Sequence, residues 1–80
     1  MATPTPEEFR ERLEWMETRR EERIALRQLY MDGKFPPGHT VNGHWQDDTV
    51  DEVDKLDAEI VDWNRQIEEY ARIWGPKSYA

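Results

Sequence analysis

Cysteine is absent from this sequence, and glycine, with four residues, and histidine, with two, are scarce. Without thiols the chain forms neither a disulfide nor a thiolate metal site, so its core has no covalent or metal reinforcement. No apolar run approaches the length of a membrane-spanning helix, and the first residues lack the apolar region of a signal peptide. We therefore expect a soluble, non-secreted protein without membrane partners.

Catalytic and metal-binding patterns are missing as well. The two histidines, His39 and His44, lie in a turn-like segment that offers too few further ligands for a metal site. No nucleophile, base and orienting group can be named together, and most acids recur at solvent-facing helix positions. We expect no enzymatic activity, no metal and no cofactor.

Basic residues are in deficit, because 11 lysines and arginines stand against 18 acids and give a net charge of -7. A general binder of nucleic acid or of an anionic membrane would be basic, so this balance argues against both. The mean hydropathy of -1.07 is low, but four Trp, three Tyr and two Phe argue against disorder. Residues 1–80 suffice for one small domain whose core is marginal alone, so we expect a homo-oligomer.

The strongest pattern is a stripe of apolar residues with 3-4 spacing over the predicted helix 49–74. This spacing places the stripe on one side of one helix, as in helices that pack side by side. Thr49 and Glu52 have the spacing of a capping box, and Gly75 ends the helix before a short tail, 75–80. The stripe, a predicted helix seam, comprises Val53, Leu56, Ile60, Trp63, Ile67, Tyr70 and Trp74.

An earlier helix is predicted over 6–31. Thr5 and Glu8 form a capping box around Pro6, and Gly33 marks the end. One side of this helix, the candidate core, carries Phe9, Leu13, Met16, Ile24 and Met31. The opposite side carries Trp15, Leu26 and Leu29.

The second apolar side has no use in an isolated helix pair, which needs only one stripe. It predicts either a partner subunit or coverage by the connector between the helices. We favour a partner, because a small hairpin covers only part of a long helix. The candidate partner interface comprises Trp15, Leu26, Leu29 and Trp45.

The connector, 33–47, holds an Asn-Gly pair at 42–43 between two short β-compatible segments. Both central residues of a two-residue hairpin turn need φ > 0, which Asn and Gly adopt most readily. This predicts a β-hairpin that pairs 39–41 with 44–46. The alternative is an irregular loop in which Trp45 packs against the helices. The predicted fold class is mainly α: an antiparallel two-helix hairpin with a short β-hairpin in the connector.

Charge is distributed in a way that supports this topology. Arginines gather in the second half of the first helix, and 47–62 holds eight acids against one base, Lys55. An antiparallel pair brings the two groups together, although each exposed ion pair contributes only roughly 0–1 kcal/mol. The candidate acidic surface, Asp51, Asp54 and Asp62, also allows another role. Regularly spaced carboxylates imitate a phosphate backbone, as in small phage-encoded inhibitors of host defence enzymes.

The order of features from Leu26 to Ile73 resembles the gpW-like head–tail joining proteins of tailed phages. In that family a first helix ends in a Gly-containing turn, a β-hairpin with a Gly turn follows, and a capped second helix is rich in Leu, Ile and aromatics. The corresponding segments here are 29–34, 41–45 and 49–56, and 60–67 is similar to the second-helix segment of some phage members.

This resemblance implies a structural virion protein without a catalytic site. Such a connector adds to the portal vertex after DNA packaging, forms a ring of identical subunits and presents the surface for the next tail-side protein. Its partners are copies of itself, the portal and a tail-side connector, in the virion or in the host cytoplasm during assembly. The acidity of this chain departs from the often basic DNA-facing segments of the family, and so favours protein attachment over sequence-specific nucleic-acid contact. A bare helical-hairpin oligomerisation module is a further alternative.

Overall fold

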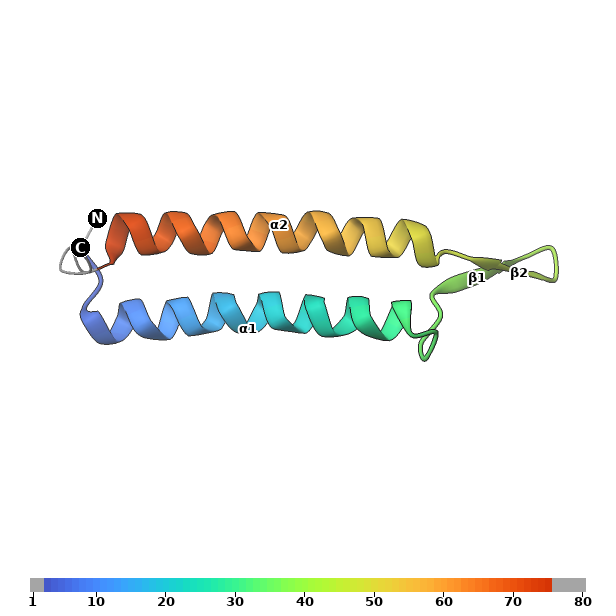
Figure 1. Ribbon diagram of the computed structural model, residues 1–80, viewed down its shortest axis with the longest axis horizontal. Helices are drawn as coiled ribbons and strands as arrows, with labels where there is room; N and C mark the ends of the chain where they lie inside the picture. The colour runs from blue at the N-terminus through green and yellow to red at the C-terminus, as the bar shows by residue number, and fades with distance from the viewer. Residues whose placement is uncertain (1–2, 76–80) are drawn as a thin grey trace.

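The computed structural model describes residues 3–75 and consists of two long helices joined by a β-hairpin (Figure 1). Helix α1 spans Pro6–Met31 and helix α2 spans Thr49–Trp74, with 26 residues each. Strands β1, Gly38–Val41, and β2, His44–Asp47, lie between them. The helices run antiparallel side by side, so the predicted helical hairpin with a short β-hairpin is confirmed.

Both ends of α1 are set by local hydrogen bonds that the sequence predicts. Thr5 Oγ1 accepts from the Glu8 N–H at 3.1 Å, and Glu8 Oε1 accepts from the Thr5 N–H at 3.3 Å. At the other end Gly33 has a φ of 71°, and the N–H groups of Gly33 and Lys34 return to carbonyls of the last turn, both at 3.2 Å. This left-handed glycine satisfies carbonyls that the helix end leaves free, so α1 stops there.

The predicted capping box of Thr49 and Glu52 at the start of α2 is wrong. The N-cap is Asp48, whose side chain makes no capping hydrogen bond. Its Oδ2 lies 2.7 Å from His39 Nδ1 instead. The Thr49 N–H donates to Asp47 Oδ1 at 2.8 Å, and the Thr49 hydroxyl donates to the same oxygen. Because the Thr49 hydroxyl is hydrogen-bonded to Asp47, it does not form the hydrogen bond that a capping box requires.

The β-hairpin forms around the predicted turn at 42–43, where the φ values are 50° and 80°. Positive φ at both positions matches the twist of a two-residue hairpin turn. Gly38 pairs with Asp47 at the base and Val41 pairs with His44 beside the turn. The ladder is therefore one residue pair longer than the sequence predicts.

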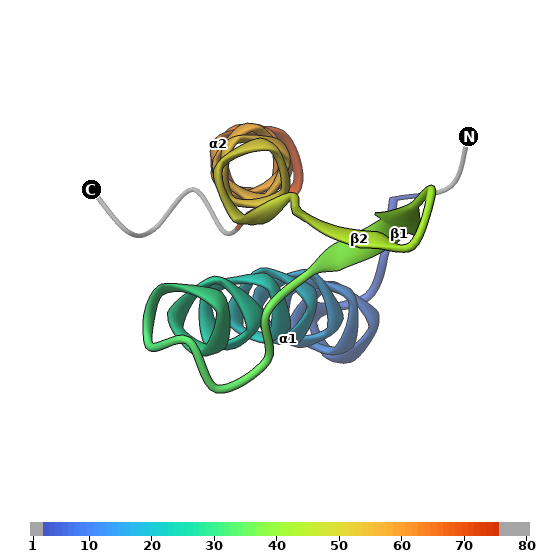
Figure 2. The same cartoon turned by 90° about the vertical axis from the view of Figure 1, so that its right-hand side faces the viewer.

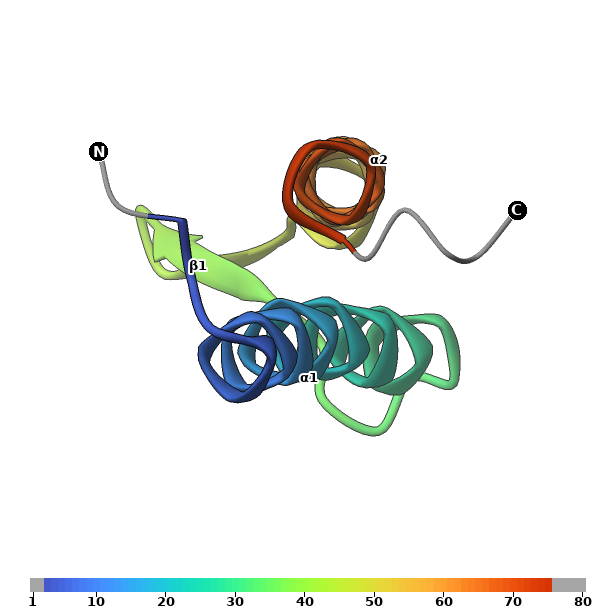
Figure 3. The same cartoon turned by 90° about the vertical axis from the view of Figure 1, so that its left-hand side faces the viewer.

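The β-hairpin extends beyond the helix pair instead of folding over it (Figure 1). The molecule is 58 Å long. A helix of 26 residues accounts for only about 39 Å of this length. Seen from the hairpin end, the strands lie to one side of the two helices (Figure 2), and the view from the other end shows where α1 begins and α2 ends (Figure 3). The alternative in which the connector covers the second side of α1 is wrong.

The core is a single layer of side chains between the two helices. Four apolar side chains are buried, Phe9 and Met16 from α1 and Val53 and Leu56 from α2, and no polar side chain of residues 3–75 is buried. None of the described helices combines the length and apolar character needed to cross a membrane. The predicted tail, 75–80, lies outside the described residues except for Gly75.

Candidate protein–protein interface

The contact between the helices follows one continuous 3-4 pattern on each helix. On α2 it is the apolar stripe described above, in which Val53 and Leu56 are buried and the other five residues are half-buried. On α1 the pattern is apolar for its first half and then changes to arginine. The α1 seam comprises Phe9, Leu13, Met16, Arg20, Arg23, Arg27 and Tyr30.

The prediction that Ile24 and Met31 belong to the core side of α1 is wrong. Their side chains are 40% and 56% exposed. Each follows a seam residue, Arg23 and Tyr30, by one position, and one position turns the side chain by about 100°. The two residues therefore lie beside the seam.

The half of the pair near the start of α1, which we call the apolar half, packs side chain on side chain. The Phe9 and Tyr70 rings stack with centroids 5.2 Å apart and planes 12° apart. Met16 is among the most buried residues of the chain, and Leu13 and Trp74 are half-buried. This half resembles a small coiled-coil core.

The half near the β-hairpin, which we call the arginine half, is held by polar contacts from α1 to α2. The arginine side chains are 26–37% exposed, so their aliphatic stems cover apolar surface of α2 while their heads reach its edge. The predicted meeting of arginines and acids takes place here. The contacts are Arg20 Nη1–Asn64 Oδ1 at 3.1 Å, Arg23 Nε–Glu59 Oε2 at 2.7 Å and Arg27 Nε–Asp57 Oδ1 at 2.6 Å.

Trp15, a candidate partner residue, makes one contact across the pair and remains 42% exposed. Its ring meets Trp63 edge to face at 5.7 Å. The guanidinium carbons of Arg12 and Arg19 lie 4.5 and 5.6 Å from the Trp15 ring centroid. A cation–π arrangement of this kind holds the exposed ring in one orientation.

The other three candidate partner residues also lie outside the core. Leu26 is half-buried and Leu29 is 42% exposed on α1. Trp45 is 58% exposed on the hairpin. Its ring occupies the space beside Gly38, where an added Cβ would collide with it. Trp45 therefore packs on its own hairpin, and the alternative in which it packs against the helices is wrong.

The candidate acidic surface lies on the outer part of α2. Asp51 and Asp54 are exposed and make no ion pair within residues 3–75. Asp62 accepts hydrogen bonds from Arg65 and from Gln66, the latter at 2.7 Å. The three carboxylates do not form an uninterrupted row, because bases lie among them.

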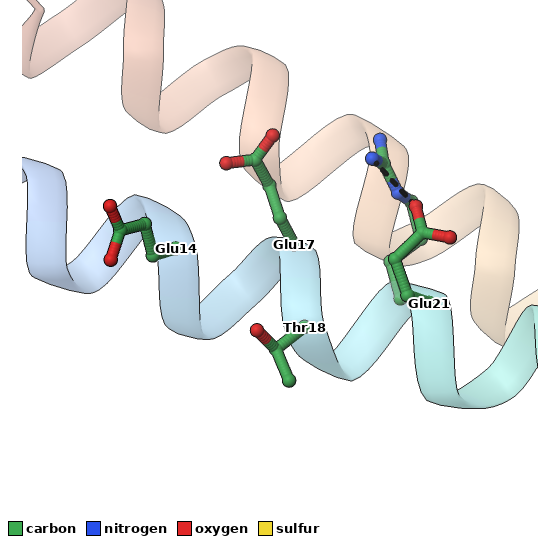
Figure 4. Close-up of a pocket in the computed structure, with 5 residues that line it drawn as sticks. Glu14, Glu17, Thr18 and Glu21 are labelled. Carbon is green, nitrogen blue, oxygen red and sulfur yellow. Dashed lines mark hydrogen bonds and ion pairs between the residues drawn. The ribbon is translucent and has the colours of Figure 1, made fainter.

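Shallow hollows lie on the surface of the pair, and two of them include residues of α1. One, of about 490 Å³, is lined by three glutamates together with Thr18 and Arg20. Figure 4 shows Glu14, Glu17 and Glu21 along α1, with Glu17 pointing toward α2, and Glu21 accepts from Arg20 at 3.2 Å. The second hollow, of about 310 Å³, lies between the helices in the apolar half, and its apolar lining is Met16, Tyr70, Ile73 and Trp74.

The titratable groups show little chemical specialisation. The hydroxyl and then the backbone N–H of Thr49, both donating to Asp47, hold the pKa of that carboxyl below its usual value. Within the described residues, no three His, Asp or Glu side chains converge as a metal site would require. The features that distinguish this surface are exposed apolar groups and charge, which are features of contact with another macromolecule.

In comparisons with known proteins, no protein-family model, no curated protein and no solved structure matches this chain.

Proposed function

We propose that this protein is a structural assembly subunit whose helices pack against further copies of the chain. The observation that carries this proposal is the contrast between a core of four buried side chains and ten large apolar side chains that are 40–74% exposed. Because the described residues leave more large apolar side chains exposed than buried, contacts with other chains would stabilise the fold by covering them. A core this small stabilises an isolated 80-residue chain only marginally, and association is a common remedy.

The most specific form of the proposal is a phage head–tail connector that oligomerises on the portal vertex and docks tail-side proteins. Its support is the resemblance in the order of helix, Gly turn, hairpin and capped helix. The separation of the hairpin from the helices adds to it. The sides of the helices are open to copies of the chain, while the hairpin carries the exposed Val41 and Trp45 for contact with a different protein.

Mass in solution across a concentration series, by light scattering and native mass spectrometry, tests this function. We expect association that rises with concentration and closed rings in electron micrographs of the assembled species. A stable two-chain species at low concentration contradicts the connector and favours the oligomerisation module or the acidic inhibitor. A single chain at every concentration up to about 1 mM, where even weak contacts of about -4 kcal/mol are half occupied, contradicts self-assembly altogether.

A further inference from the structure

Helix α1 carries different residues on the two sides of its seam. At about 100° per residue, each set falls within one sector beside the seam, and the two sectors lie on opposite faces of the helix pair. We call one set the tryptophan flank and the other the glutamate flank. The tryptophan flank comprises Glu8, Arg12, Trp15, Arg19, Glu22, Leu26 and Leu29. The glutamate flank comprises Arg10, Glu14, Glu17, Glu21, Ile24 and Met31.

The two flanks carry opposite charges toward the start of α1 and apolar side chains toward its end, so each could pack against the other at the same level. Toward the start of α1, the tryptophan flank presents the guanidinium groups of Arg12 and Arg19, which lie against the Trp15 ring. At the same level the glutamate flank presents the three carboxylates of the hollow in Figure 4. Arg19 also forms an ion pair with Glu22 of its own flank at 3.2 Å, and Arg10 of the glutamate flank lies near the level of Glu8. Arg12 and Arg19 thus lie level with acids of the other flank, and Arg10 lies level with an acid of the first, which favours contact between unlike flanks.

Toward the β-hairpin both flanks become apolar. Leu29 of the tryptophan flank is 42% exposed, and Ile24 and Met31 of the glutamate flank are 40% and 56% exposed. These residues fall in the same two turns of α1. If two copies stack in the same direction with α1 on α1, apolar groups therefore meet apolar groups and arginines meet glutamates. No shift along the helix is needed.

Helix α2 does not share this complementarity. By the same helical geometry Glu59, Asp62 and Glu69, with the single base Lys55, lie toward the tryptophan side, while Asp54, Asp57 and Glu68 lie toward the other, so acids outnumber bases on both sides. Stacked copies would bring acids toward acids along α2, and like charges repel. Attraction along α1 and repulsion along α2 tilt each copy away from the last. Each copy is then rotated relative to the one before it, about an axis that lies on the α1 side of the helix pair.

We propose that copies of this chain associate side by side through these unlike flanks, the tryptophan flank of one against the glutamate flank of the next. This inference rests on the proposed assembly function and assigns its interface. Such a contact is heterologous, so it continues from copy to copy and ends only when the rotation closes a ring. The tilt places α1 toward the inside of the ring and α2 on the outside, with every β-hairpin pointing in the same direction.

Single charge reversals on the two flanks test the contact. Glu17→Arg changes the glutamate flank, Arg19→Glu changes the tryptophan flank, and Glu11→Arg is the control on the side of α1 that faces away from both. Glu11→Arg and Glu17→Arg make the same change in net charge on the same helix. We expect each flank variant to raise the concentration at half-association by about tenfold or more, and the control to leave it within about twofold.

A mixture of the two flank variants distinguishes the unlike-flank contact from a two-fold one. Glu17→Arg keeps an intact tryptophan flank, Arg19→Glu keeps an intact glutamate flank, and the two changed flanks carry opposite charges. Alternating copies in an equal mixture should therefore restore the association that each variant has lost. A two-fold contact through a single flank would leave one of the variants as associated as the wild type. Circular dichroism checks that each variant is helical, and Glu14→Arg replaces Glu17→Arg if that variant is unfolded.

The outcomes separate this inference from the proposed function. Loss by both flank variants, retention by Glu11→Arg and rescue by mixing support the unlike-flank contact. If the wild type associates but both flank variants match the control, or if mixing restores nothing, this interface is wrong while assembly stands. If the wild type remains a single chain at every concentration, both are wrong.

Discussion

The apolar half and the arginine half of the helix pair cover the apolar stripe of α2 with different α1 side chains. In the apolar half, Phe9 and Met16 of α1 meet the aromatic end of α2. In the arginine half, α2 still contributes an apolar stripe that includes the buried Leu56, but the α1 residues that pack against it are Arg23 and Arg27. The first half packs apolar and aromatic side chains against one another, whereas the second covers apolar surface with arginine stems and fixes the partners through ion pairs.

This difference teaches where stability and alignment come from. Burial of apolar surface contributes about 25 cal/mol per Å², so the four buried side chains provide most of the stabilisation. Partly exposed ion pairs contribute roughly 0–1 kcal/mol each, but all of them form together in only one alignment of the two helices. In the arginine half the buried Val53 and Leu56 therefore hold the pair together, and the ion pairs fix its register. An apolar seam along its full length would tolerate more alignments.

The largest expected effect comes from truncation in the core. Met16→Ala in the apolar half and Leu56→Ala in the arginine half should each lower the free energy of unfolding by about 2–5 kcal/mol, because each leaves a cavity. Val61→Ala is the matched control, since Val61 is 67% exposed, and it should change stability by less than about 0.5 kcal/mol. Urea unfolding followed by circular dichroism measures all three. A negligible loss for Leu56→Ala would mean that the arginine half has no core of its own.

The next effect separates the arginine half from the β-hairpin attached to it. Gly43 has a φ of 80°, and Gly43→Val should destabilise the hairpin by about 1–2 kcal/mol because a β-branched residue is strained there. We expect the Trp45 environment and the hairpin amide protection to change while the helix content stays the same. Tryptophan fluorescence and hydrogen exchange report these changes. Loss of helix with loss of hairpin would show that α2 depends on it.

A smaller effect tests the role of arginine in the seam. Arg27→Leu continues the apolar stripe and should raise the free energy of unfolding by about 1 kcal/mol, because a hydrophobic residue often outperforms a partly buried ion pair. Asp57→Ala removes the partner and leaves Arg27 in place, and should lower it by at most about 1 kcal/mol. Thermal unfolding of both variants measures the contrast. A destabilised Arg27→Leu would mean that the ion pair itself holds this half.

The smallest effect concerns the junction between β2 and α2. Because hydrogen bonds from Thr49 lower the pKa of Asp47 in the folded state, the ionised carboxylate adds stability at neutral pH. This contribution is lost as the pH falls below the ordinary aspartate value of 3.8 and through the lowered one. Asp47→Asn should therefore be slightly less stable than the wild type at pH 7 and equal to it in strong acid. A difference that persists in acid would contradict this origin.

Much of the fold is predictable from local signals in the sequence. The 3-4 stripe of α2 predicts a helix that packs along one side, and Gly33 and the turn at 42–43 mark positions where positive φ is needed. These signals succeed because each depends on a few neighbouring residues. The cap of α2 is harder to predict, because Asp47, Asp48 and Thr49 can all cap a helix. The His39 side chain that contacts Asp48 lies on the other strand of the hairpin.

The surface was less predictable than the fold. A pattern of apolar residues alone assigns Ile24 and Met31 to the core, because arginine does not count as a seam residue. The sequence does place Arg20, Arg23 and Arg27 on the side of Phe9, and extending the 3-4 spacing through them leaves Ile24 and Met31 on a flank. The complementarity of the two flanks becomes visible only when that seam is known, since it defines which charges lie on which side.

The concentration dependence of thermal unfolding tests the central claim most directly, namely that a helix pair with too small a core is completed by copies of itself. Association of the folded state stabilises it by mass action. The account predicts that the midpoint of unfolding rises steadily as the protein is concentrated, and that Glu17→Arg removes the rise while Glu11→Arg keeps it. A midpoint that is independent of concentration for the wild type would contradict the account.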